Sequence, residues 1–167
     1  MPIVFFKSKV LPLQNKLYRL AVSMTGNRQE AEDVVQEILI KIWNKRDQWH
    51  LIQNMEAWSM RLTRNLSIDK LRSKHRRTDD IEEAYSLSDN NRLEKQIEAK
   101  FTLEKVSNWM KLLPEKQKIV LHLRDIEGLS YKEIAEQTGI DDNQVKTYLF
   151  RARKNLRNKL KALYENE

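Results

Sequence analysis

The sequence contains no cysteine, which excludes disulfide bonds and cysteine-ligated zinc sites and is typical of a cytoplasmic protein. Only three glycines and three prolines occur in 167 residues, whereas Leu, Lys, Glu and Arg are abundant. This composition predicts an all-α fold. The apolar PIVFF segment near the N-terminus is too short to cross a bilayer and lacks a cleavage-site pattern, so we expect no membrane insertion.

Residue patterns that would support chemistry are also missing. Neither glycine-rich phosphate-binding motif, G-x-x-x-x-G-K-[ST] or G-x-G-x-x-G, is present. The histidines His50, His75 and His122 are far apart, and none has a second metal-ligand candidate at helical spacing. We therefore expect no catalytic residue, no metal and no cofactor, and we do not expect an enzyme.

The balance of charge favours a polyanionic partner. The chain has 31 Lys and Arg against 24 Asp and Glu, which gives a net charge of +7 at pH 7. A soluble protein with a basic surface can have the same totals, so the position of the cations along the chain has to decide between the two interpretations.

Residues 129–156 have the pattern of two short helices joined by a tight turn, the second helix being basic. Ser130 and Glu133 have the spacing of a capping box, and Gly139 supplies the backbone freedom that a sharp turn requires. Along the second helix the apolar residues form one stripe, which consists of Val145, Leu149, Ala152 and Leu156. The opposite face is polar and cationic and consists of Gln144, Lys146, Thr147, Tyr148, Phe150, Arg151, Arg153 and Lys154. This is typical of a helix-turn-helix that enters a DNA major groove, although a basic hairpin of an ordinary helical bundle has the same period.

The N-terminal half has its clearest helical period between Ala31 and Trp43, with Asn27 as the expected N-cap. Its core stripe consists of Ala31, Val34, Val35, Ile38, Leu39, Ile42 and Trp43. The other face begins acidic and ends basic, which matches the helix dipole. Such a face can simply be solvated, so spacing alone leaves its role open.

An aromatic and basic region follows this helix. Trp49 lies in residues 47–56, which lack a helical period and are predicted to form a loop. A third helix then begins, and residues 61–77 contain seven Lys or Arg against a single acidic residue. Cations interleaved with Trp49 and Trp58 suit a single-stranded nucleic acid, whose bases stack on aromatic rings while its phosphates meet the cations. A solvated helix end is the alternative.

Changes in composition divide the chain into two small helical domains joined by a polar linker. Residues 1–77 form the first predicted domain. Residues 78–98 are acidic and polar with few large apolar side chains, and we interpret them as the linker. Residues 99–167 form the second predicted domain, in which four helices include the helix-turn-helix.

Three stretches of the chain carry a resemblance to a known family. They read LYRLAVSMTGNRQEAEDVVQEILIKIW, EAWSMRLTRNLSIDKLR and LPEKQKIVLHLRDIEGLSYKEIAEQTGI followed by VKTYLFRARKNL. In this order they resemble the region-two core, the promoter-melting helix and region four of alternative sigma factors of the extracytoplasmic-function (ECF) type. The resemblance covers residues 16–160 apart from the linker.

The resemblance implies a cytoplasmic, non-catalytic subunit that binds core RNA polymerase and directs promoter-specific transcription initiation. The residues implied to bind the clamp coiled coil of the polymerase's largest subunit are Asp33, Gln36 and Glu37. The residues implied at the melted minus-ten strand are Trp49, Trp58, Arg61, Arg64 and Asn65. Those implied at the minus-thirty-five duplex are Gln144, Lys146, Thr147, Phe150, Arg151 and Arg153. Many relatives are also held inactive by an anti-sigma factor, a further partner that the resemblance implies.

The start of the second helix-turn-helix helix departs from the family pattern. Asp141 and Asp142 stand where many relatives have small residues. Two carboxylates help to cap the helix but repel phosphate, so the minus-thirty-five sequence of a relative should not be transferred to this protein. Two other functions remain open from the sequence: a dimeric, free-standing DNA-binding regulator and a non-catalytic helical adaptor.

Overall fold

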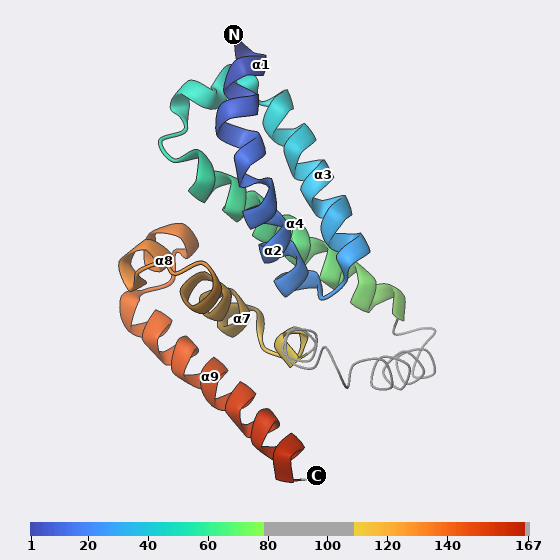
Figure 1. Cartoon of the computed structure of the whole chain (residues 1–167), viewed down its shortest axis with the longest axis vertical. Helices are drawn as coiled ribbons and strands as arrows, with labels where there is room; N and C mark the ends of the chain where they lie inside the picture. The colour runs from blue at the N-terminus through green and yellow to red at the C-terminus, as the bar shows by residue number, and fades with distance from the viewer. Residues whose placement is uncertain (79–108, 166–167) are drawn as a thin grey trace.

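Two groups of helices make up the part of the chain that the computed structural model describes, residues 1–78 and 109–165. We call residues 1–78 the N-terminal lobe and residues 109–165 the C-terminal lobe (Figure 1). Within these residues the secondary structure is entirely helical, as the composition predicts. Apart from Thr78, which ends a helix, the predicted linker lies outside the described residues, and so does the start of the second predicted domain.

The N-terminal lobe begins with a helical segment that changes its winding near Pro12. Its parts are α1 (Pro2–Phe5), the π-helical η1 (Phe6–Val10), the 3-10 helix η2 (Leu11–Leu13) and α2 (Gln14–Thr25). Because Pro12 has no backbone N–H, a regular α-helix cannot continue through it without losing a hydrogen bond. The left-handed Gly26, with φ of 66°, then ends α2.

Helix α3 (Arg28–Asn44) forms as the sequence predicts. The Oδ1 atom of Asn27 accepts a hydrogen bond from the backbone N–H of Glu30 at 3.1 Å, which confirms the predicted N-cap. The predicted stripe faces inward: five of its members are buried, and Leu39 and Trp43 pack against them at the edge. The next segment differs from the prediction, because η3 (Arg46–Leu51), a 3-10 helix, occupies part of the expected loop.

Helix α4 (Met55–Thr78) packs with α3 against α2, the central helix of the N-terminal lobe. Its most deeply buried face carries three small polar side chains, Ser59, Thr63 and Ser67, and one apolar side chain, Met60. The larger Trp58, Leu62 and Leu66 are only partly buried at the edge of the core. Small side chains at these positions let α4 approach α2 closely, and they hide the helix's buried face from a search for apolar periodicity.

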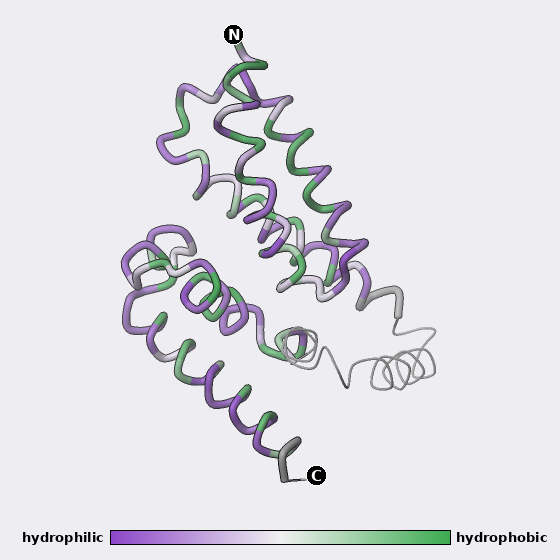
Figure 2. The backbone as a smooth tube through the Cα atoms, viewed as in Figure 1, coloured by the Kyte–Doolittle hydropathy of each residue, from purple (hydrophilic) through white to green (hydrophobic). Residues whose placement is uncertain are grey.

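The C-terminal lobe contains the predicted helix-turn-helix. Its described elements are α7 (Glu115–Leu121), η4 (His122–Ile126), α8 (Tyr131–Thr138) and α9 (Asp142–Glu165). Element η4 is a π-helical turn, in which the N–H of Glu127 bonds to the carbonyl of His122 at 3.0 Å. Ile126 lies at the end of this wider turn and is 48% exposed. Helix α9 packs on α7 and shows alternating hydrophobic and hydrophilic stretches (Figure 2).

The two lobes are docked against each other. Helix α2 contacts α7, and α4 contacts α8 (Figure 1). Their side chains join one continuous set of buried residues, which runs from Leu17 and Leu20 in α2 to Ile119 and Leu123 in the C-terminal lobe. The sequence predicts the two bodies but contains no pattern that predicts this docking.

Candidate nucleic-acid interface

The cap and turn within residues 129–156 set the orientation of α9 relative to α8. Ser130 Oγ accepts from the N–H of Glu133 at 3.1 Å, and Glu133 Oε1 accepts from the N–H of Ser130 at 3.2 Å, so the predicted capping box is present. Gly139 takes the left-handed conformation with φ of 75° and ends α8. The carbonyl of Asp141 then accepts the first hydrogen bond of α9. A capped helix, a glycine turn and a second helix therefore follow each other in the arrangement of a helix-turn-helix.

The solvent face of α9 carries the residues that the sequence assigns to duplex DNA. All six residues of the predicted set are exposed: Gln144, Lys146, Thr147, Phe150, Arg151 and Arg153. Phe150 is 68% exposed on this face. Val145, Leu149 and Ala152 are buried on the opposite face, as their spacing predicts.

A groove of about 410 Å³ lies along this face. It is lined by Tyr131, Lys146, Leu149, Phe150, Arg153, Lys154 and Arg157. The ring centroid of Tyr131 lies 5.8 Å from Lys146 Nζ and 4.7 Å from Arg124 Cζ, so the ring is surrounded by cations. Tyr131 was not among the predicted site residues, because its position in α8 does not share the period of α9.

Arg153 is held in place by an acidic residue of η4. Its Nε donates to Asp125 Oδ2 at 3.1 Å, and its Nη2 donates to Oδ1 of the same carboxylate. These hydrogen bonds raise the pKa of Arg153, so the guanidinium stays charged. Because Asp125 pairs with its guanidinium, Arg153 is less available to bind a phosphate than Arg151, which is exposed on the same helix.

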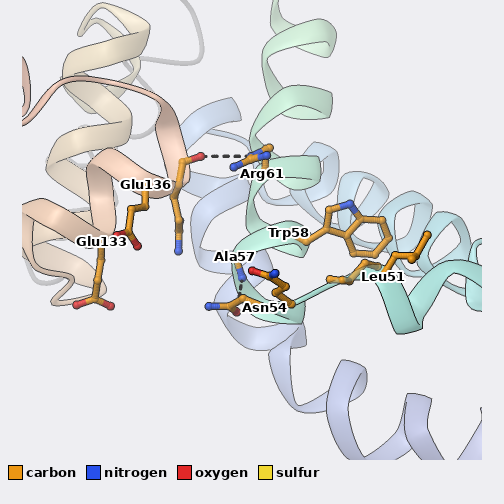
Figure 3. A pocket seen from close by; sticks show the side chains of 10 residues that line it. Leu51, Asn54, Ala57, Trp58, Arg61, Glu133 and Glu136 are labelled. Atoms are coloured by element: carbon orange, nitrogen blue, oxygen red, sulfur yellow. Dashed lines mark hydrogen bonds between the residues drawn. The ribbon is translucent and has the colours of Figure 1, made fainter.

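Four of the five predicted single-strand residues, all except Trp49, lie on α4, and two of these four line a cleft of about 600 Å³ between the lobes (Figure 3). Trp58 and Arg61 line this cleft from the N-terminal lobe, and Glu133 and Glu136 line it from α8. Arg61 Nε donates to the carbonyl of Gln137 at 3.3 Å across the lobe boundary, which is one of the dashed lines in Figure 3. Of the predicted residues, Trp58 and Arg61 are therefore brought together here.

Arg64 and Asn65 follow on α4, where Arg64 Nε and Nη2 both lie 3.4 Å from Asn65 Oδ1. Asn65 is exposed, whereas Arg64 is half-buried. Burial, followed by repulsion from Arg61, lowers the pKa of Arg64. Arg64 also borders a small gap lined by Leu20 and Ile119, so part of its side chain faces the other lobe.

The structure corrects the placement of Trp49. The sequence pattern puts its ring in a polar loop where a base could stack, but the side chain is only 8% exposed. Its ring stacks on Phe5 at a centroid distance of 5.0 Å and meets Trp43 edge-on at 6.2 Å. Its Nε1 donates to the carbonyl of Ile42 at 2.9 Å, so its polar atom is also satisfied. In this structure the ring is therefore part of the core.

The predicted polymerase-binding residues lie together on the outer face of α3. Asp33, Gln36 and Glu37 are all exposed. Glu37 Oε1 pairs with Lys70 of α4 at 3.2 Å, and half of the Glu37 side chain remains accessible. Three polar side chains one helical turn apart give a negatively charged ridge that suits a basic helical partner.

The described residues offer neither a metal site nor a membrane span. No group of three or more His, Asp or Glu side chains within residues 1–78 and 109–165 could hold a metal ion. In the same residues, no helix combines the length and the apolar character needed to cross a bilayer. His122 is buried, bonds to Ser23 and Glu127 and lies at the contact between the lobes.

A helix-turn-helix with an exposed cationic face, beside a second helical lobe with its own basic helix, defines a DNA-binding protein of two parts. Two family models match these parts: Sigma-70 region 2 matches residues 10–77, and Sigma-70, region 4 matches residues 103–156. The ECF RNA polymerase sigma factor SigW of Bacillus subtilis (strain 168) is 32% identical over 162 residues, which cover 90% of this chain and 86% of SigW. RNA polymerase sigma factor SigV of the same strain is 33% identical over 141 residues, which cover 84% and 81%.

Solved structures agree with the sequence comparison. The sigma factor RpoE of Bartonella quintana, solved in complex with the anti-sigma factor NepR, has a TM-score of 0.72 and 25% identity to this chain. The match covers 93% of this chain and 96% of RpoE. The chain belongs to the ECF RNA polymerase sigma factors. It is an alternative sigma factor that binds core RNA polymerase and promoter DNA and directs promoter-specific initiation, with region 4 as its minus-thirty-five-binding domain.

Proposed function

We propose that the two lobes divide promoter recognition through the exposed side chains described above. The residues of α9 that we assign to the minus-thirty-five duplex are Gln144, Lys146, Thr147, Phe150, Arg151 and Arg153. The residues of α4 that we assign to the melted minus-ten strand are Trp58, Arg61, Arg64 and Asn65. What supports this division is that a family match to region 2 and one to region 4 each coincide with an exposed cationic helix.

On α9, three kinds of side chain suit the major groove. Lys146 and Arg151 donate hydrogen bonds to guanine or to phosphate, and Gln144 can pair with adenine. Phe150 is exposed by 68% and suits the methyl group of thymine. Each good base contact contributes roughly 1–3 kcal/mol of discrimination. Arg153, held by Asp125, suits the backbone at the edge of the groove.

On α4, the side chains suit an opened strand. Flipping a base out of the duplex costs a few kcal/mol, and stacking on an aromatic ring returns about 1–3 kcal/mol. Trp58 supplies such a ring at the wall of the cleft. Arg61 and Arg64 supply charge for phosphates, and Asn65 supplies donors and an acceptor for a base edge. We assign Trp49 to the support of η3 because its ring is buried.

The acidic ridge of α3 completes the assignment. Asp33, Gln36 and Glu37 would contact the clamp coiled coil of the polymerase's largest subunit, to which their charge and exposure are suited. We further propose domain limits of 1–77 and 99–167 with a linker at 78–98. The chain has no catalytic activity of its own in this proposal, and it acts in the cytoplasm.

An anti-sigma factor is a further proposed partner of this chain. The support is the fold shared with RpoE, which was solved with NepR bound. Affinity purification of the tagged chain from its host, with mass spectrometry of the retained proteins, tests this part of the proposal. If polymerase subunits are recovered but no further protein is retained in an amount equal to the tagged chain, the proposed anti-sigma partner is contradicted.

Gel filtration with core RNA polymerase tests the main proposal. The chain should co-elute with core polymerase and support run-off transcription from a cognate promoter. Asp33→Lys combined with Glu37→Lys should abolish co-elution by reversing the charge of the ridge. Asp47→Lys combined with Glu32→Lys is the matched control, because both residues are exposed carboxylates outside the assigned set. Equal losses in the two double variants would contradict the assignment of the ridge.

A further inference from the structure

Two adjacent carboxylates stand at the start of the recognition helix. Asp142 is the first residue of α9, and Asp141 immediately precedes it. Both side chains are exposed, and neither makes a hydrogen bond or an ion pair with any other residue of the described part of the chain. In the same lobe, by contrast, Asp125 bonds to Arg153, and Glu133 completes the cap of α8. The described structure therefore has no internal use for the carboxylates of Asp141 and Asp142.

Asp142 lies on the stripe of α9 that lines the groove. Lys146 follows it by four residues and Phe150 by eight, and both line the groove of about 410 Å³. Side chains four residues apart lie above one another on the same face of an α-helix. Lys146 Nζ lies 5.8 Å from the ring centroid of Tyr131 and makes no ion pair with Asp142. Asp142 thus extends the groove face by one turn, and its charge is not neutralised there.

Asp141 occupies a different position, although it has the same charge and is also exposed. It stands four residues before Val145, which is fully buried. The backbone carbonyl of Asp141 accepts from the N–H of Val145 at 2.8 Å, so this residue begins the hydrogen bonding of the helix. The four-residue spacing places Asp141 beside the buried stripe and not on the groove stripe. The two neighbouring carboxylates therefore differ in what they can present to DNA.

The chemistry of a carboxylate in the major groove favours one base. The first residues of a recognition helix contact base edges, and a carboxylate only accepts hydrogen bonds. Cytosine presents its N4 amino group as a donor, whereas guanine and thymine present acceptors. Adenine also has an amino group, but its neighbouring N7 is an acceptor that repels a carboxylate. A carboxylate on the groove face therefore favours cytosine and disfavours the other three bases.

The rest of α9 can offset the repulsion between this carboxylate and the phosphates. Residues 143–164 contain seven Lys or Arg and no Asp or Glu. These cations attract the DNA backbone whatever its sequence, and they do not distinguish bases through phosphate contacts. A carboxylate that faces the wrong base meets an acceptor, which lowers the affinity for that sequence alone. Asp142 is therefore suited to discriminate between promoters, and the cations are suited to hold the duplex.

Helix geometry also predicts where this base lies. Asp142 and Lys146 are one helical turn apart, which is about 5.4 Å along the axis of α9. Successive base pairs are about 3.4 Å apart along the duplex. The two side chains should therefore contact positions roughly one to two base pairs apart.

We propose that Asp142 is a specificity-determining residue of this sigma factor, which selects cytosine in the minus-thirty-five element next to the position contacted by Lys146. The inference rests on the function proposed above for α9, because it requires the groove face of this helix to lie against the duplex. It adds to that function the base that is selected, the residue that selects it and the register of the contact.

Selection from a promoter library tests the inference. The full chain is assembled with core polymerase and mixed with promoters whose minus-thirty-five region is randomised, and the bound DNA is sequenced. Lys146→Ala identifies the position that Lys146 contacts, because the base preference there should be lost in this variant. The unmodified chain should enrich cytosine at least about fivefold, on one strand, roughly one to two base pairs from that position.

A change of preference distinguishes base contact from a general effect of charge. Asp142→Asn should move the preference at this position from cytosine to adenine, because a carboxamide pairs with N6 and N7 of adenine. Asp141→Asn is the matched control, because it removes the same charge from the same end of the helix but lies off the groove stripe. It should leave the preference for cytosine unchanged. Circular dichroism of both variants should show the helicity of the unmodified chain.

The outcomes separate the inference from the function on which it rests. If the unmodified chain enriches no cytosine within two base pairs of the Lys146 position, or if Lys146→Ala relaxes no position, the proposed register is overturned. If Asp142→Asn and Asp141→Asn select the same sequences, the role of Asp142 is overturned even though α9 reads the element. If the unmodified chain binds core polymerase but enriches no minus-thirty-five sequence at all, the function proposed for α9 is overturned.

Discussion

Arg153 of the recognition helix and Asp125 of the π-helical turn form a two-pronged ion pair, with Arg153 Nε at 3.1 Å from Asp125 Oδ2. The pair ties α9 to η4 and offsets one cation on the DNA-binding face. Asp125→Asn should therefore release Arg153 to phosphate and steepen the dependence of log affinity on log salt by about 0.9, the value for one additional phosphate contact. Fluorescence anisotropy with duplex DNA at several salt concentrations measures this slope. Asp69→Asn on α4 is the control, and an equal change in that variant would show only an effect of net charge.

Base contacts and phosphate contacts on α9 can be separated by the sequence dependence of the loss. Lys146→Ala should weaken binding to the cognate minus-thirty-five duplex by about 1–3 kcal/mol, with a smaller loss on an unrelated sequence. Arg151→Ala should instead weaken binding to both sequences if its contact is to phosphate, and should reduce the salt slope. Competition binding with the two duplexes measures both variants. Equal losses on both sequences for Lys146→Ala would contradict a base contact by that side chain.

Local signals in the sequence predict the helices and much of α9. Helix caps depend only on residues that are close in sequence, so they can be predicted without the tertiary structure. This holds for Asn27, for the capping box of Ser130 and Glu133, and for Gly139. The exposed and buried faces of α9 follow from period alone. The family resemblance, carried by three ordered stretches, predicts the function that the comparisons support.

Features that depend on distant parts of the chain could not be predicted in the same way. Trp49 looks exposed among polar neighbours in the sequence, but Phe5, more than forty residues earlier, covers its ring. The π-helical turn at η4 shifts the period and exposes Ile126. Ser23 and His122 give no sequence signal of their contact, because they lie 99 residues apart and meet only when the lobes dock.

The capping box gives a direct test of local stability in the C-terminal lobe. Ser130→Ala removes the side-chain acceptor for the N–H of Glu133 and should lower the free energy of unfolding by about 1 kcal/mol. Urea unfolding followed by circular dichroism measures the change. Ser130→Asp should retain most of the stability because aspartate also caps helices. A Ser130→Ala variant as stable as the original chain would show that the cap is dispensable.

The burial of Trp49 leads to different expectations for Trp49 and Asn65. Trp49→Ala should lower the free energy of unfolding of the N-terminal lobe by about 3–5 kcal/mol, because it leaves a cavity beside Phe5 and Trp43. Asn65→Ala should leave stability unchanged and reduce strand opening, which permanganate reactivity of unpaired thymines at the promoter reports. Trp49→Phe should be intermediate in stability. A stable Trp49→Ala variant with a selective defect in strand opening would instead support base contact by Trp49.

Acid should weaken the contact between the lobes through Glu127. Burial alone would raise the pKa of this carboxyl group, but hydrogen bonds from His122 and Arg19 outweigh burial and lower the pKa from 4.5 to about 2. A depressed folded-state pKa means that the stabilisation is fully present above about pH 4.5 and is lost as the pH falls toward 2. The free energy of unfolding, measured by urea unfolding between pH 6 and pH 3, should therefore fall with pH in the original chain. Glu127→Gln should remove this part of the loss, and an unchanged pH response in that variant would contradict the assignment.

The position of Trp58 at the wall of the cleft gives the protein an optical signal of its own conformation. In a state with the lobes apart, the indole of Trp58 would lie in bulk water, whereas Trp43 and Trp49 would keep their aromatic neighbours. Tryptophan emission should therefore move to longer wavelength on opening, and this shift should be smaller in Trp58→Phe. Stopped-flow fluorescence of the unlabelled chain mixed with polymerase could then time the opening and show whether it precedes or follows capture of the promoter.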